Sequence, residues 1–299
     1  MADRDGCERG VAPEVRSERR GPRLAAAVRV AVAVALSAPA SARAQGPTED
    51  FAAAFGRAFD GVAACGVLRD VAAGAQPAVS DLQACGERLP PCAAFEVAAN
   101  VVAIDRGIVP DADTPVRREL QGDDPEQKSA ERGVNLRDAF RKPEPWVYEE
   151  LARRIGPEAY GKALAALRYG NADASASPVE RMWLGESPDG LRISPVEQVD
   201  FLARLKRGEL PTSAESQARA VEIIPFERIP EGLFAWKSGE CGPAGGDRVA
   251  WAIGWVDRGG RSTIYSAVEK GAEVTGADAL GRMRAVLNEL SLTPPPPKR

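Results

Sequence analysis

The C-terminal part of the chain carries the pattern that most constrains its fold, because short apolar runs alternate there with glycines. Three runs are rich in β-branched and aromatic residues: 233–237 (LFAWK), 250–256 (AWAIGWV) and 262–268 (STIYSAV). Residues 257–261 (DRGGR) join the second run to the third, and adjacent glycines are typical of tight hairpin turns. The pattern predicts three consecutive antiparallel strands.

Patterns typical of helices surround these strands, since apolar residues recur at helical spacing in six further segments. The segments are 51–59, 91–107, 146–155, 157–167, 194–208 and 275–290. One more strand is expected at 61–71, and the polar stretch 110–133 is expected to be a surface loop. This order predicts an α+β fold, an antiparallel sheet completed from both chain ends and flanked by helices, with a helical subdomain inserted.

The helix expected at 194–208 has the clearest ends. Ser194 stands at the N-cap position and Pro195 at the first helical position. Glu197 completes an S-x-x-E capping box, and Gly208 is expected to end the helix.

The absence of histidine from all 299 residues restricts the chemistry of the chain. Ser-His-Asp and Cys-His nucleophiles and histidine-ligated zinc all need imidazole. The glycine-rich motifs that cradle dinucleotides and nucleoside triphosphates are also missing from the sequence. We therefore expect no cofactor and no metal, and the net charge of −4 gives no electrostatic basis for binding nucleic acid.

The N-terminus has the pattern of an export signal. Arg19, Arg20 and Arg23 precede an apolar core at 30–36, and residues 41–44 (SARA) supply an A-x-A cleavage site. A disordered tail and a membrane anchor are the alternatives, but the apolar run is well short of the ~20 residues that a span needs. The expected divisions are a signal peptide at 1–44, one domain at 45–292 and a proline-rich tail at 293–299. We expect a periplasmic protein with no stable membrane span after cleavage.

An exported chain can form disulfides, and four cysteines follow the expected cleavage site: Cys65, Cys85, Cys92 and Cys241. Cys85 and Cys92 lie seven residues apart on either side of a proline pair and are the expected bridge. The alternative is two free thiols, and no C-x-x-C motif occurs.

Four stretches of the sequence belong together. LRYGNADAS at 167–175 is followed by MWLGESPDGLRISPVEQVDFLARL at 182–205, and LFAWKSGE at 233–240 is followed by VAWAIGWVDRGGR at 249–261. In this order they resemble the class D β-lactamases, the oxacillinases, within the penicillin-recognising serine enzyme superfamily. The resemblance covers roughly residues 60–290 and implies that superfamily's fold.

The resemblance also implies a reaction whose central residues are missing here. In family members a serine at a helix start attacks the lactam carbonyl, and a carbamylated lysine three residues on acts as the base. Residues 91–96 read PCAAFE, which places Ala93 at the nucleophile position and Glu96 at the base position. No Ser, Thr or Cys stands three residues before any lysine in the chain.

Other family positions are partly retained. The family's Ser-x-Val pair falls on residues 143–145 (PEP) and is lost, whereas Tyr-Gly-Asn and Lys-Ser-Gly survive. The resemblance assigns seven residues to substrate binding. One is Arg282, which matches the family's carboxylate-binding arginine. The other six are Tyr169, Asn171, Trp183, Lys237, Ser238 and Gly239.

These residues predict a catalytically impaired homologue that at most binds β-lactam or peptidoglycan-like ligands without reacting. One alternative is a hydrolase in which Glu96 acts as general base for water. A second uses Cys92 as nucleophile, although it stands one residue early on the helix. A third is a periplasmic protein-interaction domain.

Overall fold

The computed structural model describes residues 47–118, 132–176, 178–187, 189–243 and 246–295. All of them belong to one compact unit. The expected signal peptide, most of the expected loop at 110–133 and the end of the proline-rich tail lie outside the described residues. Within the described ranges no helix is long and apolar enough to cross a membrane.

The described helices and strands follow one another in the order that the sequence predicts, with further short elements between them. The α-helices are α1 (Pro47–Ala58), α2 (Glu96–Asp105), α4 (Leu136–Arg141), α5 (Pro145–Ile155), α6 (Pro157–Leu167), α7 (Pro195–Arg207), α8 (Ala214–Ile223) and α9 (Gly276–Glu289). The 3-10 turns are η1 (Ala84–Gly86), η2 (Cys92–Phe95) and η3 (Val179–Arg181). The strands are β1 (Ala63–Asp70), β2 (Ala78–Val79), β3 (Phe226–Ile229), β4 (Gly232–Cys241), β5 (Arg248–Arg258) and β6 (Arg261–Gly271).

The strands form one six-stranded sheet in the order β2-β1-β6-β5-β4-β3, with every neighbouring pair antiparallel. The three strands predicted near the C-terminus are β4, β5 and β6. Arg258 pairs with Arg261 across a two-residue turn, and Gly259 and Gly260 have φ values of 57° and 76°. Because two successive positive φ angles favour glycine, this local sequence sets the register of the hairpin.

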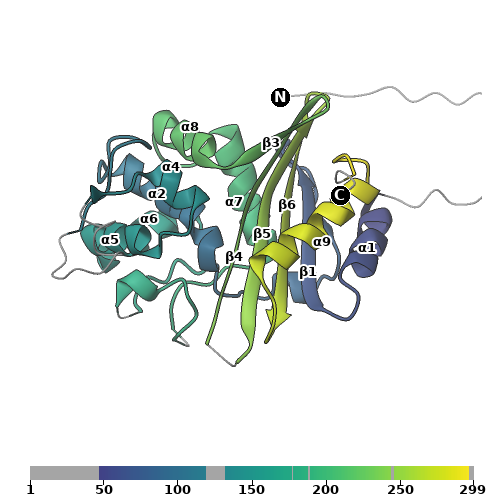
Figure 1. Cartoon of the computed structure of the whole chain (residues 1–299), viewed down its shortest axis with the longest axis horizontal. Coiled ribbons are helices and arrows are strands. Elements are labelled where there is room, and N and C mark those ends of the chain that lie inside the picture. The colour runs from purple at the N-terminus through teal and green to yellow at the C-terminus, as the bar shows by residue number, and fades with distance from the viewer. Residues whose placement is uncertain (1–46, 119–131, 177, 188, 244–245, 296–299) are drawn as a thin grey trace, which may run out of the picture. The chain divides into compact units, whose positions relative to one another are not determined.

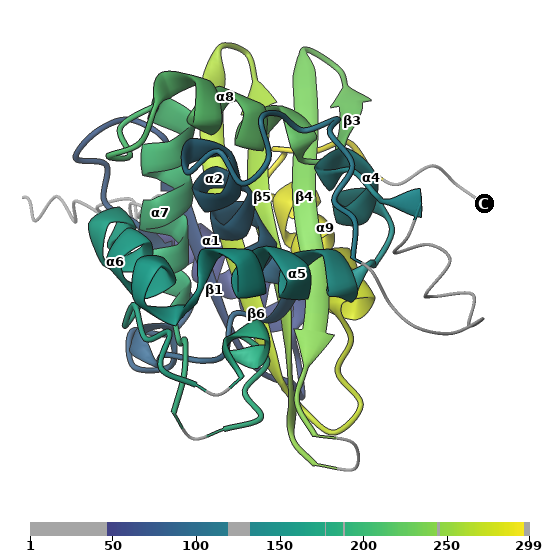
Figure 2. The same cartoon turned by 90° about the vertical axis from the view of Figure 1, so that its left-hand side faces the viewer.

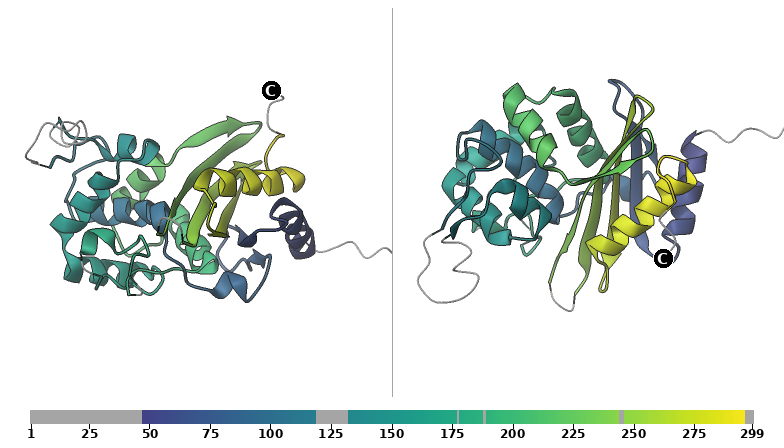
Figure 3. Two further views of the ribbon diagram at one scale, coloured as in Figure 1. Left: turned by 60° about the horizontal axis from the view of Figure 1, so that its bottom comes forward. Right: turned by 45° about the horizontal axis from the view of Figure 1, so that its top comes forward.

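Helices cover both faces of the sheet (Figures 1 and 3). Helices α1 and α9 lie on one face, and α2, α4, α5, α6, α7 and α8 lie on the other. Each face has its own cluster of buried apolar side chains. The chain between β2 and β3 builds the larger helical layer, seen from the front in Figure 2. The predicted α+β fold with an inserted helical subdomain is therefore confirmed.

The predicted capping of α7 is also confirmed. The Ser194 hydroxyl accepts a hydrogen bond from the Glu197 amide at 3.2 Å, and the Glu197 carboxylate accepts one from the Ser194 amide at 2.9 Å. Gly208 ends the helix with a φ of 71°.

The predicted Cys85–Cys92 bridge is wrong. The disulfides join Cys65 to Cys85 and Cys92 to Cys241, each with a Cα–Cα distance of 5.3 Å. The turn η1 packs against β1 and η2 packs against β4, so the two thiols face different strands although they are close in sequence. Sequence spacing alone could not show this, because both pairings depend on the sheet.

Candidate active site

The start of helix α2 lies directly on strand β4, and three contacts join them. Cys92 is covalently bound to Cys241. A Cβ atom placed on Gly239 would lie 2.5 Å from the Cβ of Ala93, so only glycine permits this approach. One turn further along, Glu96 forms an ion pair with Lys237. The structure therefore brings the expected nucleophile, base and Lys-Ser-Gly positions together.

The Glu96–Lys237 pair is largely withdrawn from solvent. The Lys237 side chain is 9% exposed and the Glu96 side chain 14% exposed. Lys237 Nζ donates to Glu96 Oε2 and also to the carbonyl oxygen of Phe140, at 3.1 Å. The same ammonium lies 4.2 Å from the centroid of the Phe140 ring. Lys237 thus already has an anion, a carbonyl and an aromatic face around its charge.

The environment of Glu96 acts on its protonation in two directions. Burial raises the pKa of the Glu96 carboxyl above its usual range, while the Lys237 ammonium and the Tyr148 hydroxyl oppose that rise. Burial raises the pKa of Tyr148 well above its usual value, with a further contribution from the charge of Glu96, so the phenol stays protonated. A carboxyl with a raised pKa holds its proton to higher pH than an exposed carboxyl does, and such a perturbed group beside a buried lysine is a candidate for proton transfer.

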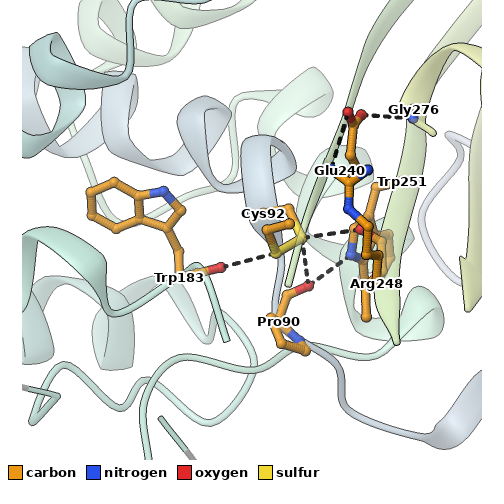
Figure 4. The surroundings of a disulfide bond; sticks show 9 residues. Pro90, Cys92, Trp183, Glu240, Arg248, Trp251 and Gly276 are labelled. Carbon is orange, nitrogen blue, oxygen red and sulfur yellow. Dashed lines mark hydrogen bonds and ion pairs between the residues drawn. A yellow bond between two sulfur atoms is a disulfide. The ribbon is translucent and has the colours of Figure 1, made fainter. Parts of the chain in front are cut away.

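The surroundings of the Cys92–Cys241 disulfide fix the turn before α2 (Figure 4). The Cys92 amide donates to the Trp183 carbonyl at 3.1 Å. Trp251 Nε1 donates to the Pro90 carbonyl at 2.8 Å. The Trp183 ring is buried and stacks on Phe95 with ring centroids 5.0 Å apart. Because Cys92 is in a disulfide, it provides no thiol to act as a nucleophile.

The Tyr-Gly-Asn motif serves the local structure. Tyr169 is fully buried, and its hydroxyl donates to Gln198 Oε1 at 3.0 Å. The Asn171 side-chain amide donates to the Gly190 carbonyl at 2.9 Å, and its oxygen accepts from the Arg192 amide at 2.9 Å. Both side chains fasten the segment between α6 and α7, and neither has a hydrogen bond to the Glu96–Lys237 pair.

Two of the expected substrate-binding residues face away from this pair. Because side chains alternate along a strand, Ser238 points to the α9 face of the sheet while Lys237 points to the α2 face. Arg282 on α9 forms an ion pair with Glu269 of β6, in which Nη1 donates to both carboxylate oxygens at 2.7 Å. The structure therefore does not place Arg282 beside Lys237.

Sequence reasoning missed the polar groups next to Glu96. The Tyr148 hydroxyl interacts with the carboxyl, Asn100 interacts with Tyr148, and Phe140 supplies the carbonyl bonded to Lys237. Asn100 was detectable, because it is a lone polar residue four positions after Glu96 in the apolar stretch VAANVVAI.

Comparison with known families agrees with this geometry. Residues 52–223 match the family model described as the penicillin binding protein transpeptidase domain. The chain belongs to this family. The β-lactamase OXA-2 of Salmonella typhimurium is 30% identical over 219 residues, which cover 71% of this chain and 74% of that protein. The β-lactamases OXA-19 and OXA-11 of Pseudomonas aeruginosa are each 29% identical, and the chain spans 67% and 66% of their lengths.

Solved structures of the family share the fold of this chain. The class D β-lactamase FUS-1 (OXA-85) of Fusobacterium nucleatum has a TM-score of 0.68 and 23% identity, over 80% of this chain and 95% of that one. The C-terminal domain of the Bacillus licheniformis BlaR penicillin receptor has a TM-score of 0.70 and 21% identity, over 80% and 96%. The class D β-lactamase resemblance is confirmed at the level of family and fold.

Proposed function

We propose that this class D β-lactamase-like domain is catalytically impaired and at most binds β-lactam or peptidoglycan-like ligands without forming a covalent bond to them. The buried Glu96–Lys237 ion pair beside Ala93 carries the proposal. The resemblance assigns Ala93 to the position of the family's nucleophile, Glu96 to the position of its base and Lys237 to a ligand-binding lysine.

The first step of the family reaction has no nucleophile here. Ala93 carries only a methyl group, and Cys92 is bound to Cys241. Acyl transfer to a side chain needs an activated oxygen or sulfur at that position. The same loss argues against a sensor that reports β-lactams through acylation.

Lys237 is also a poor receptor for a ligand carboxylate. An incoming anion would have to replace Glu96 at the ammonium, and it would leave the Glu96 carboxylate buried without its counter-charge. Separating a buried ion pair in this way costs about 3–5 kcal/mol. Any binding must therefore draw on other contacts, and we expect it to be weak.

Export to the bacterial envelope is part of the proposal. The two disulfides support an oxidising compartment such as the periplasm. The proposed mature protein begins at Gln45, after a signal peptide, and carries one domain over 45–292.

The test uses protein produced from Gln45 onward, with OXA-2 as an active control. We expect no hydrolysis of a chromogenic cephalosporin above that of a Lys237→Ala variant, and no mass increase after incubation with benzylpenicillin. Turnover that Lys237→Ala abolishes, or a stoichiometric adduct, would overturn the proposal.

A second candidate is hydrolysis with Glu96 as general base for water, which the raised pKa of this carboxyl favours. The contact with Lys237 opposes it, because the base would have to leave its ion pair. Glu96→Gln keeps the shape of the side chain and removes its basicity. If any measured turnover survives this change, Glu96 is not the base.

A further inference from the structure

A cavity of about 630 Å³ lies beside the hairpin that joins β5 to β6, and none of Ala93, Glu96 and Lys237 lines it. Its walls come from the start of α1, from β1 and β2, from the end of β5 and the start of β6, and from the residues after α9. Helices α1 and α9 cover this face of the sheet (Figure 1), whereas Lys237 points to the other face. Cavities of about 300–1,000 Å³ are typical of small-molecule sites, and this one falls within that range.

One wall of the cavity is the surface of the sheet. Val256 pairs with Thr263, and Thr263 pairs with Asp70, so these three side chains form one row across β5, β6 and β1. Val256 is buried in the apolar cluster under α1 and α9. Three leucines that pack against the same cluster also line the cavity: Leu68, Leu290 and Leu292.

Two arginines line the cavity side by side at its hairpin end. Arg258 of β5 and Arg261 of β6 are directly opposite each other across the turn, and like charges in this arrangement repel. Arg261 has a counter-charge, since its Nη2 donates to Asp70 Oδ2 at 2.9 Å. Arg258 Nη1 donates to the carbonyl oxygen of Ser291, and among the described residues no carboxylate pairs with this guanidinium. Because a carbonyl carries no net charge, the charge of Arg258 is left without compensation.

Two other charged residues line the cavity, and each has its own stabilising contact. Arg69 Nη1 donates to Asp200 Oδ1 of α7 at 3.0 Å. Asp50 lies in the first turn of α1, where the positive end of the helix dipole favours a carboxylate. The cavity therefore combines an apolar wall with one arginine whose charge is not neutralised, a combination that suits an anion with an apolar body.

We propose that this cavity binds a small amphiphilic carboxylate, whose head group pairs with Arg258 and whose apolar body lies against Val256 and the three leucines. A guanidinium presents its N–H donors in one plane, and this geometry matches the two oxygens of a carboxylate. The hydrogen bond to Ser291 uses only Nη1, so further donors remain for an anion. The site lies on the face of the sheet opposite Glu96 and Lys237, and the inference does not depend on the proposed function.

Titration of the protein from Gln45 onward with octanoate, followed by backbone amide chemical shifts, tests the site. We expect saturable shifts at the residues that line the cavity, and no such shifts with octylamine, whose head group has the opposite charge. Octanol has the same chain without a charge and should bind about tenfold more weakly or worse, because a hydrogen bond to a charged group is lost. Shifts that fall elsewhere, no shifts at all, or equal affinities for octanoate and octanol would overturn the proposal.

Three substitutions separate the charge of the cavity from its shape. Arg258→Gln should raise the Kd for octanoate about tenfold or more. The matched control is Arg228→Gln, which removes an exposed charge from the edge strand β3, outside the cavity, and should leave the Kd unchanged. Ala78→Phe fills the cavity from β2 and should abolish binding although Arg258 is kept. If Arg258→Gln binds octanoate as tightly as wild type does, or Ala78→Phe still binds it, the proposal is wrong.

Discussion

Replacing Lys237 with methionine isolates the Glu96 carboxyl in the interior and makes stability depend on pH. Methionine fills the volume of the lysine stem without its charge. At neutral pH the variant has a carboxylate that is 14% exposed and has lost its ion-pair partner. Removing one partner of a buried pair costs about 3–5 kcal/mol, so we expect a loss of about 3 kcal/mol at pH 7.

The sign of the pH dependence follows from the raised pKa of Glu96. The native state holds this proton more tightly than the unfolded chain, whose carboxyl titrates near its ordinary value of 4.5. Stability is therefore retained below that value and lost as pH rises through the folded pKa, which removing Lys237 raises further. The slope approaches about 1.4 kcal/mol per pH unit for one proton.

Urea unfolding of wild type and Lys237→Met between pH 4.5 and 8 measures the difference. We expect the gap between them to be small at pH 4.5 and to widen with rising pH. Glu96→Gln in the Lys237→Met background should recover most of the loss at pH 8. The matched control is Lys162→Met, because the Lys162–Glu158 pair is exposed on both sides and should contribute less than about 0.5 kcal/mol. A gap that does not change with pH would refute this account of Glu96.

The remaining predictions concern the contacts between α2 and β4 and the cross-links. Cys241→Ser opens a disulfide between cysteines 149 residues apart and should destabilise the protein by up to about 5 kcal/mol. Cys65→Ser opens one with a separation of 20 residues and should cost about 3 kcal/mol, both measured by guanidinium unfolding. Equal or reversed losses would contradict the loop-length reasoning. Gly239→Ala should cost about 1–3 kcal/mol in the same assay because its Cβ would meet Ala93, whereas Gly281→Ala in α9, with nothing within 4 Å, should stabilise. Ala93→Ser alone should give no penicillin adduct in intact-mass spectra, because the base position still carries a carboxylate held by a lysine; a full adduct would show that the serine alone restores acylation.

The sequence predicted the parts of the fold that depend on neighbouring residues. The hairpin at Gly259 and Gly260 and the capped helix from Ser194 follow from local backbone preferences. The short helix α8 was missed although Ser213 caps it, because half of its ten residues are polar and three of the others are alanines, so no clear apolar stripe is visible. The edge strand β3 has only four residues and an exposed Phe226, so alternation was not visible there.

In the candidate site, too, the sequence predicted the positions within motifs but not the contacts between distant residues. Family motifs aligned Ala93, Glu96 and Lys237, and the structure brings these three together. Arg282 is paired with Glu269 of β6, a contact that no local pattern encodes, and its assignment to carboxylate binding stays a prediction. The ion pair itself could not be read from the sequence, since its two residues lie 141 positions apart.

The connectivity of the disulfides has a consequence for how the chain matures. Synthesis runs from the N-terminus, so Cys65, Cys85 and Cys92 are all made before Cys241, which follows Cys92 by 149 residues. During that interval Cys92 meets only wrong partners, and the short loop to Cys85 makes that encounter the most frequent. The mature cross-links therefore require either that Cys92 stay reduced until β4 is made or that a thiol exchange correct an early mispairing. If exchange is the route, the yield of the native protein depends on a disulfide isomerase in the compartment where the chain folds.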